Sequence, residues 1–303
     1  MCGRGEQRPA RPNQALHGPS LDKRALGQAS ARSGSNRSCE RRRGEVGGMI
    51  SVVIPTLNEA ENLQPLLERL LAETVVPEII VVDGGSDDGT PQVGLSSGVH
   101  FIPSPAGRGV QLHAGAAAAS GDVLLFLHAD CRFPQGGLAR IKRVLSANPE
   151  CIGGNHRLIF DGTDSFSQWL DGFYAWIRSH GVYYGDSGIF VRRAALEAVG
   201  GIRPIALMED FDLVRRLERY GETICISDPP LVTSSRRFEG RHPVAIVWGW
   251  LKIHALYYLG VPPSRLARIY DSERRADHSP TTDTMESVNR VSSDSPITKG
   301  GIT

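Results

Sequence analysis

Short apolar runs alternate with amphipathic segments through the central part of this 303-residue chain. The β-branched run from Ile50 to Thr56 is followed by leucines at helical spacing, and the run from Glu78 to Asp83 leads into a turn of glycine and aspartate. This alternation predicts a strand, a helix and a second strand in that order. Asn58 is the predicted N-cap of the first helix.

Two more apolar runs, at 100–105 and 123–130, flank a helix of small residues that is predicted to begin after Gly107. The run at 123–130 is the most apolar and is therefore the predicted central strand. Beyond it we expect strands at 152–160 and 188–191 and helices at 165–178 and 210–220. Repeated strand-helix-strand units of this size predict an α/β fold with a mostly parallel sheet flanked by helices.

The two ends of the chain differ in composition from the centre. Residues 1–48 are rich in Arg, Gly, Ser and Pro, residues 271–303 are rich in Ser, Thr and Asp, and neither segment shows apolar periodicity. Such segments cannot bury enough apolar surface to offset the entropy cost of ordering. We therefore predict a disordered basic extension, a domain at 49–270 and a disordered polar tail. Because Met49 directly precedes the first strand, a further hypothesis is that the natural start lies there.

The overall charge and the cysteines narrow the classes of function. A formal net charge of +1 gives no general electrostatic attraction for nucleic acid, which requires clustered Lys and Arg. The five cysteines are odd in number and have no CxxC spacing, which indicates neither a disulfide framework nor a zinc site. Free thiols suit a reducing compartment, and the predicted localisation is cytoplasmic.

The apolar stretch at 242–263 approaches the length of a membrane span, but Lys252 and His254 interrupt it. Its tryptophans and tyrosines suit an interface as well as a core. We predict a C-terminal helical segment that packs on the domain or lies at the inner face of a membrane. A lipid-linked acceptor would suit the second arrangement.

Acidic residues gather where predicted strands end. Asp83 closes one strand, Asp130 closes the central strand, and Glu209 with Asp210 stands at the start of a helix. Carboxylates at the carboxyl ends of strands line the crevice in which open α/β sheets bind ligands. They are also the hard oxygen ligands that Mg²⁺ and Mn²⁺ prefer beside a phosphorylated substrate. The pattern predicts an enzyme that acts on a nucleotide or sugar phosphate.

An ordered set of motifs resembles family-2 glycosyltransferases of the GT-A fold: IPTLNEAENL, VVDGGSDDGT, the stretch 107–122, LLFLHADCRFP, YGDSGIFVRR and MEDFDLVRRL. The resemblance is closest to the bacterial subgroup called selenodomain-associated or arsenosugar-type glycosyltransferases, and it runs from Met49 to Tyr270. It implies a Rossmann-like sheet and a nucleotide-sugar donor, UDP-linked. It also implies inverting transfer by single displacement, with Mg²⁺ or Mn²⁺ as cofactor.

The resemblance assigns nucleoside contacts to Pro55, Thr56 and Glu59 at the end of the first strand, and base and ribose contacts to Asp83. A helix cap is the alternative role for Glu59, and a turn is the alternative for Asp83. For Asp88, donor binding and a purely local turn or N-cap are both open.

Arg108 lies between glycines near a helix start, where it could bind phosphate together with free backbone N–H groups. Asp130 is the predicted metal ligand, at the place of the family's DxD motif. The first Asp of that motif is replaced by His128, which departs from a two-carboxylate site. For His128, ribose or phosphate contact and strand capping are both open.

Asp210 is the general base that the resemblance implies, and Glu209 is its acceptor-orienting neighbour. The alternative for both is a favourable interaction with the helix dipole in a first turn. Asp186 is assigned to the sugar and acceptor pocket. Arg236 and Arg237 are predicted to close over the diphosphate, because a guanidinium fork matches phosphate oxygens.

Two other functions stay open from the sequence. A sugar-phosphate nucleotidyltransferase shares the α/β layout and acidic metal sites, but it would have a Gly-rich basic loop after its first strand, and IPTLNEAEN is not such a loop. The other is a catalytically silent glycan- or nucleotide-binding module, against which Asp130 and Asp210 argue.

Overall fold

The computed structural model describes residues 48–238 and 240–277, which all lie in one compact unit of the chain, Gly44–Thr303. Its strands are β1 (Ile50–Thr56), β2 (Glu78–Asp83), β3 (His100–Pro103), β4 (Val123–Phe126), β5 (Gly153–Phe160), β6 (Ile189–Arg192) and β7 (Thr223–Thr233). Its α-helices are α1 (Ala60–Leu71), α2 (Thr90–Ser96), α3 (Arg108–Ala118), α4 (Gly137–Ala147), α5 (Ser165–Ser179), α6 (Arg193–Ala198), α7 (Glu209–Tyr220), α8 (Pro243–Tyr258) and α9 (Pro263–Asp277). Two short 3-10 helices are η2 (Gly185–Ser187) and η3 (Arg236–Phe238).

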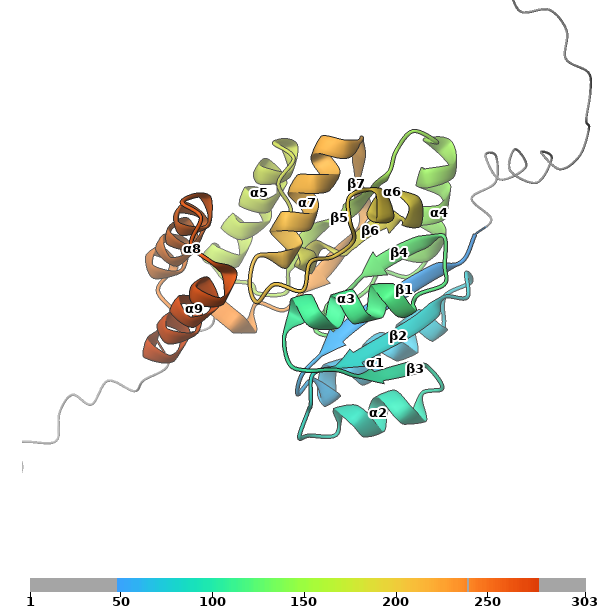
Figure 1. The fold of residues 1–303 in the computed structure, drawn as a ribbon, viewed down its shortest axis with the longest axis horizontal. Coiled ribbons are helices and arrows are strands. Elements are labelled where there is room, and N and C mark those ends of the chain that lie inside the picture. The colour runs from blue at the N-terminus through green and yellow to red at the C-terminus, as the bar shows by residue number, and fades with distance from the viewer. Residues whose placement is uncertain (1–47, 239, 278–303) are drawn as a thin grey trace, which may run out of the picture. The chain divides into compact units, whose positions relative to one another are not determined.

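The strands form one sheet in the order β3-β2-β1-β4-β6-β5-β7 (Figure 1). Strand β4 lies at the centre, as its apolar run predicts. Strands β3, β2, β1 and β4 are parallel to their neighbours in this row, whereas β6 runs antiparallel to β4 and β5. The predicted α/β fold with a mostly parallel sheet and C-terminal helices is confirmed. Because β1, β2 and β4 end at one edge, the segments that follow them meet there.

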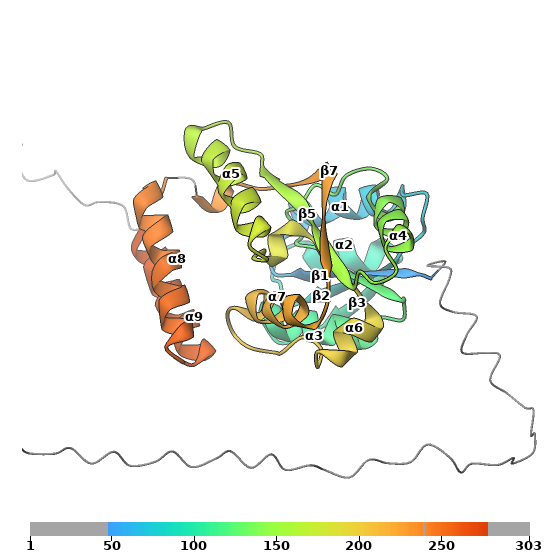
Figure 2. The same cartoon turned by 90° about the horizontal axis from the view of Figure 1, so that it is seen from above.

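Helices cover both faces of the sheet (Figure 2). Side chains of β1 alternate between the faces: Val52 packs into a cluster with leucines of α1, and Val53 into another with Leu112 of α3 and Leu213 of α7. Burial of such a side chain contributes about 1.5–3 kcal/mol. Helix α3 approaches β1 closely, since a Cβ at Gly115 would lie 2.3 Å from Val53 Cγ1. A larger residue there would push α3 away from the sheet.

The prediction that Asn58 caps the first helix is wrong. Glu59 occupies the N-cap position of α1, and Asn58 has a φ of 55° in the left-handed region that Asn tolerates. The Asn58 side chain instead accepts from the N–H of Asp87 at 3.0 Å, and its own N–H donates to Ser86 Oγ at 2.8 Å. Asn58 therefore ties the turn after β1 to the loop after β2.

Several predicted boundaries move by a few residues. Strand β4 ends at Phe126, where its pairing with β6 stops, so 127–130 is a loop rather than strand. Strand β3 ends at Pro103, and helix α9 continues to Asp277, past the predicted domain boundary at 270. The predicted extension, apart from residue 48, and the remainder of the predicted tail lie outside the described residues.

Helices α8 and α9 pack against the start of α7. Ile253 of α8 and Leu266 of α9 form a buried cluster with Met208 and Phe211. Among the described helices, none has both the length and the apolar character needed to cross a bilayer. The contact of α8 with α7 brings residues of the C-terminal segment next to the Glu209–Asp210 pair.

Candidate active site

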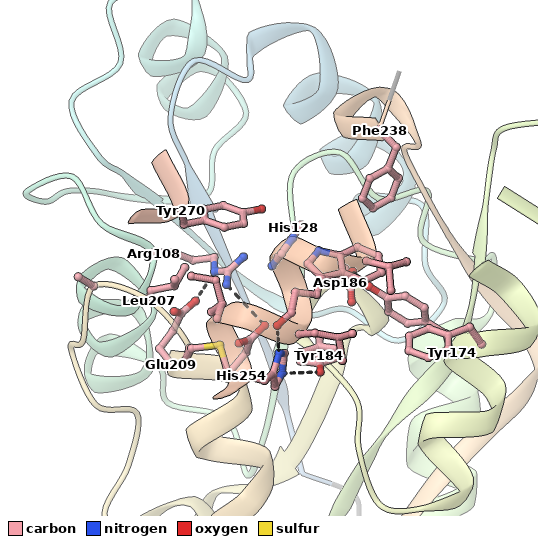
Figure 3. Close-up of a pocket in the computed structure, with 18 residues that line it drawn as sticks. Arg108, His128, Tyr174, Tyr184, Asp186, Leu207, Glu209, Phe238, His254 and Tyr270 are labelled. Carbon is pink, nitrogen blue, oxygen red and sulfur yellow. Dashed lines mark hydrogen bonds and ion pairs between the residues drawn. The ribbon is translucent and has the colours of Figure 1, made fainter. Parts of the chain in front are cut away.

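A cavity of about 510 Å³ lies between the loop after β4 and the helices α3, α5, α7, α8 and α9 (Figure 3). Five predicted site residues line it: Arg108, His128, Asp186, Glu209 and Asp210. The other lining residues are mostly apolar or aromatic: Phe173, Tyr174, Tyr184, Ala206, Leu207, Met208, Phe238, Val247, Trp250, Leu251, Ile253, His254 and Tyr270. A concave, mostly apolar pocket with a few convergent polar groups has the character of a ligand site.

Arg108, the first residue of α3, joins the two acidic residues that begin α7. Its Nε donates to Glu209 Oε1, and its Nη2 lies 3.5 Å from Asp210 Oδ2 (Figure 3). The Arg108 side chain is 36% exposed, whereas Glu209 and Asp210 are only 1% and 8% exposed. The guanidinium thus compensates the charge of both buried carboxylates.

The two carboxylates respond differently to burial. Burial raises the pKa of Glu209 above its ordinary value, and the charge of Arg108 offsets this only in part. Burial would also raise the pKa of Asp210, but Arg108 and the backbone N–H groups of Gly185 and Phe211 outweigh it, so the pKa is lowered. Burial opposes the charge of Arg108, yet both carboxylates raise its pKa. Asp210 is therefore held as an anion at the wall of the cavity.

Backbone groups fix the position of the Asp210 carboxylate. The N–H of Gly185 donates to Oδ2 at 2.9 Å, and the N–H of Phe211 donates to Oδ1 at 2.7 Å. A Cβ at Gly185 would lie 3.3 Å from that Oδ2 and 3.0 Å from His128 Nε2, so a larger residue would require these side chains to shift by a few tenths of an ångström. Met208, which precedes α7, has a φ of 68°, a conformation that costs a non-glycine residue about 1 kcal/mol and often marks a functional site.

The C-terminal helix α8 contributes a histidine to the cavity. His254 Nδ1 lies 2.8 Å from the carbonyl oxygen of Trp250, to which it can only donate, and in the neutral ring Nε2 then accepts from the Tyr184 hydroxyl at 2.9 Å. The Tyr184 ring stacks on Phe211 at 6.0 Å. Tyr184, which precedes Gly185, therefore contacts both α7 and α8.

His254, Trp250 and Tyr270 line the site, although the sequence patterns do not single them out as site residues. One signal was available, because His254 interrupts an otherwise apolar helix. Its partner Tyr184, whose hydroxyl needs a polar contact when buried, comes from a segment 70 residues away, which the sequence does not reveal.

Asp83 lies at the end of β2, as predicted, and is 4% exposed. Its carboxylate accepts from the N–H groups of Gly85 and Ser86 at 3.0 and 2.9 Å. The hydroxyls of Ser86 and Thr56 contact it at 2.5 and 3.3 Å. These four donors match the acceptor capacity of a carboxylate. In this arrangement Asp83 holds the turn after β2 and joins it to the end of β1.

Gln111 of α3 is another residue that the patterns do not single out. Its amide is 4% exposed and donates to the carbonyl oxygens of Thr56 and Val82 at 2.7 and 2.8 Å. Thr56 is the last residue of β1 and Val82 is the last but one of β2, so Gln111 fixes the two strand ends relative to each other. A polar side chain on the buried face of a helix was the available signal.

Asp88 serves the local turn in the structure. Its Oδ1 accepts from the N–H and hydroxyl of Thr90 at 2.8 and 2.5 Å, and its Oδ2 accepts from the N–H of Ala60 at 3.2 Å. These hydrogen bonds, foremost that from the Thr90 hydroxyl, lower the pKa of Asp88. The loop after β2 is thereby attached to the first turn of α1.

The carboxyl-terminal ends of β1, β2 and β4, together with the residues that follow them, form what we call the strand edge. Arg236, in the segment after β7, contacts this edge. Its Nη2 lies 2.6 and 2.7 Å from the two carboxylate oxygens of Glu59 and 3.9 Å from Asp130 Oδ2. The hydrogen bond to Glu59 is the main cause of a raised Arg236 pKa. Arg236 and Asp130 therefore lie together, as their predicted roles on one diphosphate require.

The predicted site residues thus fall into two groups. Arg108, His128, Asp186, Glu209 and Asp210 line the cavity. Pro55, Thr56, Glu59, Asp83, Asp88, Asp130 and Arg236 lie along the strand edge beside it. The side chain of Arg237 lies outside the described part of the structure.

One carboxylate at the centre of the strand edge, that of Asp130, is available to a divalent cation. Within residues 48–238 and 240–277, no three His, Cys, Asp or Glu side chains come together as a metal cluster. Asp130 follows the central strand, and its side chain is 22% exposed. Mg²⁺ commonly takes one or two carboxylates and completes its shell with substrate phosphates and water. The donor set therefore fits a cation bound together with a diphosphate.

Comparison with known proteins finds similarity to glycosyltransferases. Residues 51–195 match the family model for glycosyl transferase family 2. This match covers 145 of the 303 residues. The glycosyltransferase AglE of Haloferax volcanii is 26% identical over 166 residues, which cover 50% of this chain and 55% of that protein. Matches to the first curated relatives span between 30% and 55% of their lengths.

Two solved structures illustrate the similarity in fold. A mannosyltransferase from Pyrobaculum calidifontis, in complex with GDP-mannose and Mn²⁺, has a TM-score of 0.53 at 19% identity, covering 75% of this chain and 69% of that chain. Glucosyl-3-phosphoglycerate synthase from Mycobacterium tuberculosis, in complex with Mn²⁺, UDP and product, has a TM-score of 0.51 at 19% identity, covering 77% and 88%. These similarities establish the fold.

Proposed function

We propose that this chain is an inverting glycosyltransferase that moves a sugar from a nucleotide sugar, UDP-linked, to an acceptor hydroxyl by metal-assisted single displacement. The observation that carries the proposal is the Asp210 carboxylate. It is buried, held as an anion by Arg108 and two backbone N–H groups, and borders a cavity of about 510 Å³. A fixed carboxylate beside a pocket of this size has the properties of a general base.

Asp210 would accept the proton of the acceptor hydroxyl as the hydroxyl oxygen bonds to the anomeric carbon. In the same step the bond from that carbon to the diphosphate breaks, and the electron pair leaves with the diphosphate. A positioned base contributes about 10²- to 10⁴-fold to the rate. Glu209 would orient the acceptor, and Arg108 would keep both carboxylates in place while offering its exposed nitrogens to phosphate.

The strand edge would hold the donor. Pro55, Thr56 and Glu59 would border the nucleoside, and Asp83 and Asp88 would shape the loop that receives it. A direct contact of Asp83 with the nucleoside would require the Ser86 hydroxyl to turn away from the carboxylate.

The diphosphate would lie between the two groups of residues. Arg236, Arg237 and His128 would bind its oxygens, and Asp186 would contact the sugar. Asp130 would hold Mg²⁺ or Mn²⁺, which would neutralise part of the charge that the leaving diphosphate gains. The GDP and UDP complexes of the two fold relatives support a nucleoside diphosphate at this edge.

The finer assignments rest on the motifs and on α8. The order of the motifs supports the selenodomain-associated or arsenosugar-type subgroup. The exposed apolar residues of α8 support contact of 242–263 with a membrane, at the cytoplasmic face, and a lipid-linked acceptor.

Calorimetric titration with UDP, GDP and ADP, with and without Mn²⁺, tests the donor assignment. We expect UDP to bind wild type in a Mn²⁺-dependent manner and at least tenfold more weakly to Asp130→Ala. Binding of GDP in place of UDP would overturn the donor base but keep the mechanism. Pyrophosphate release from a nucleoside triphosphate and a sugar phosphate would indicate a nucleotidyltransferase. Absence of any nucleotide binding would indicate the silent module.

A further inference from the structure

The tryptophans of this chain are confined to two helices. All four lie on α5 and α8: Trp169 and Trp176 on α5, Trp248 and Trp250 on α8. Three of them are unusually accessible, with exposed fractions of 47% for Trp169, 60% for Trp176 and 68% for Trp248. Large aromatic side chains are mostly buried in water-soluble domains, so a gathering of exposed ones indicates a binding surface.

An apolar groove of about 570 Å³ runs between these helices. It is lined by Ser165, Phe166, Trp169, Pro243, Val244, Val247, Trp248 and Leu251. Apart from Ser165, every lining residue is apolar. The groove therefore suits a hydrocarbon and offers almost nothing to a sugar or a phosphate.

The groove adjoins the reaction cavity. Val247 and Leu251 line both spaces, which places one end of the groove beside the cavity that Asp210 borders. Aromatic side chains that line the cavity pack on Trp250 of α8: Phe173 of α5 stacks on it at 6.5 Å, and Phe238 meets it edge-on at 5.7 Å. A molecule long enough to fill both would be polar at the Asp210 end and apolar at the other.

We propose that the groove between α5 and α8 binds the alkyl chain of an amphiphilic acceptor whose hydroxyl-bearing head lies in the reaction cavity. This inference rests on the proposed function and names the acceptor's chemical class. A membrane surface would not need the connection through Val247 and Leu251. A second copy of the chain would cover the exposed tryptophans without entering the cavity.

Tryptophan fluorescence gives a direct test, because every tryptophan lies on these two helices. The probe is an alkyl glucoside of about twelve carbons with bromine at the far end of the chain, used below its critical micelle concentration. Bromine quenches tryptophan only on contact. We expect saturable quenching of the monomeric protein by the monomeric probe.

Two substitutions and one matched control locate the binding. Val244→Gln and Leu251→Gln should each weaken binding at least tenfold, because they place an amide in the groove. Trp176→Gln removes an equally exposed aromatic residue of α5 that does not line the groove, and it should change the affinity less than twofold after correction for its lost signal. Equal loss in all three variants would overturn the proposal.

Other outcomes also decide. Quenching by brominated lipid vesicles but not by the monomeric probe would assign the surface to a membrane. A protein that is dimeric by analytical ultracentrifugation and resists the probe would assign the surface to a second copy. UDP titration of the same preparation tests the proposed function separately, since donor binding does not need the groove. Probe binding without UDP binding would support an alkyl-binding groove and overturn the proposed glycosyltransferase function.

Discussion

Two clusters of acidic residues in this chain have different environments. Asp83, at the end of β2, and Asp88, in the loop after it, accept hydrogen bonds from that loop, and Asp88 also accepts from the first residue of α1. Glu209 and Asp210, at the start of α7, are buried and meet Arg108, which is 101 residues from Glu209 in sequence. The first cluster builds a loop, whereas the second presents a fixed charge to a cavity.

The difference in environment indicates which cluster transfers a proton and which one shapes the donor site. A carboxylate whose acceptor positions are filled by local donors has little capacity to take a proton from a substrate. Asp210 also accepts hydrogen bonds from backbone N–H groups, but it lines the cavity. Arg108 stabilises its negative charge. We therefore assign proton transfer to the α7 cluster and the shaping of the donor site to the β2 cluster.

The largest expected effect comes from Asp210→Asn, which keeps the shape of the side chain and removes its basicity. We expect kcat for release of UDP from the UDP-sugar in the presence of an acceptor to fall about 10²- to 10⁴-fold. UDP affinity should stay within threefold of wild type, because the strand edge is unchanged. Steady-state kinetics and calorimetry measure the two quantities.

Asp88→Asn is the matched change in the other cluster. It should raise KM for the donor more than it lowers kcat, since it loosens the loop against α1 without touching the cavity. If both substitutions lowered kcat alike, the division of labour between the clusters would be wrong.

The next effect concerns stability. Arg108→Ala leaves Glu209 and Asp210 buried without their cation, and breaking a buried pair typically costs about 3–5 kcal/mol. Because Arg108 is 36% exposed and solvent can screen the carboxylates, we expect a smaller loss of about 2 kcal/mol in the free energy of unfolding. Urea denaturation measures it, and Glu209→Gln in the Arg108→Ala background should restore part of the loss.

Arg236→Ala removes a guanidinium that also bridges two carboxylates, Glu59 and Asp130, but at the surface. With 48% of the Arg236 side chain exposed, we expect a change below about 1 kcal/mol. A loss as large as that of Arg108→Ala would show that burial is not what distinguishes the two arginines.

Much of the fold follows from local pattern. The apolar runs predict the bounds of β1 and β2 correctly at both ends. A buried parallel strand is read from the sequence as an uninterrupted stretch rich in β-branched residues. The end of β4 is missed, since the apolar run continues to Leu127 while the pairing with β6 stops at Phe126. Asn58 is mistaken for a cap because its polar contacts are made with the loop after β2, which no local pattern reveals.

The site divides in the same way. Arg108, Asp130 and Asp210 stand in motifs and can be named from the sequence. His254 and Trp250 cannot, because they belong to a helix that reaches the cavity through tertiary packing, including that of Ile253 on the start of α7. Acceptor-side residues come from elements far apart in the chain, and their meeting is a property of the tertiary structure.

The smallest expected effect is a difference in sign between Glu209 and Asp88 as pH changes. The pKa of Glu209 is raised from 4.5, so between that value and the folded pKa the native state holds a proton that the unfolded chain has lost. Its contribution to the free energy of unfolding therefore falls as pH rises through this window. The pKa of Asp88 is lowered from 3.8, so its contribution falls as pH drops below that value. Urea denaturation from pH 3 to pH 7 should show Glu209→Gln flattening the upper slope and Asp88→Asn flattening the lower one; the same slope lost in both variants would mean that the two clusters titrate as one.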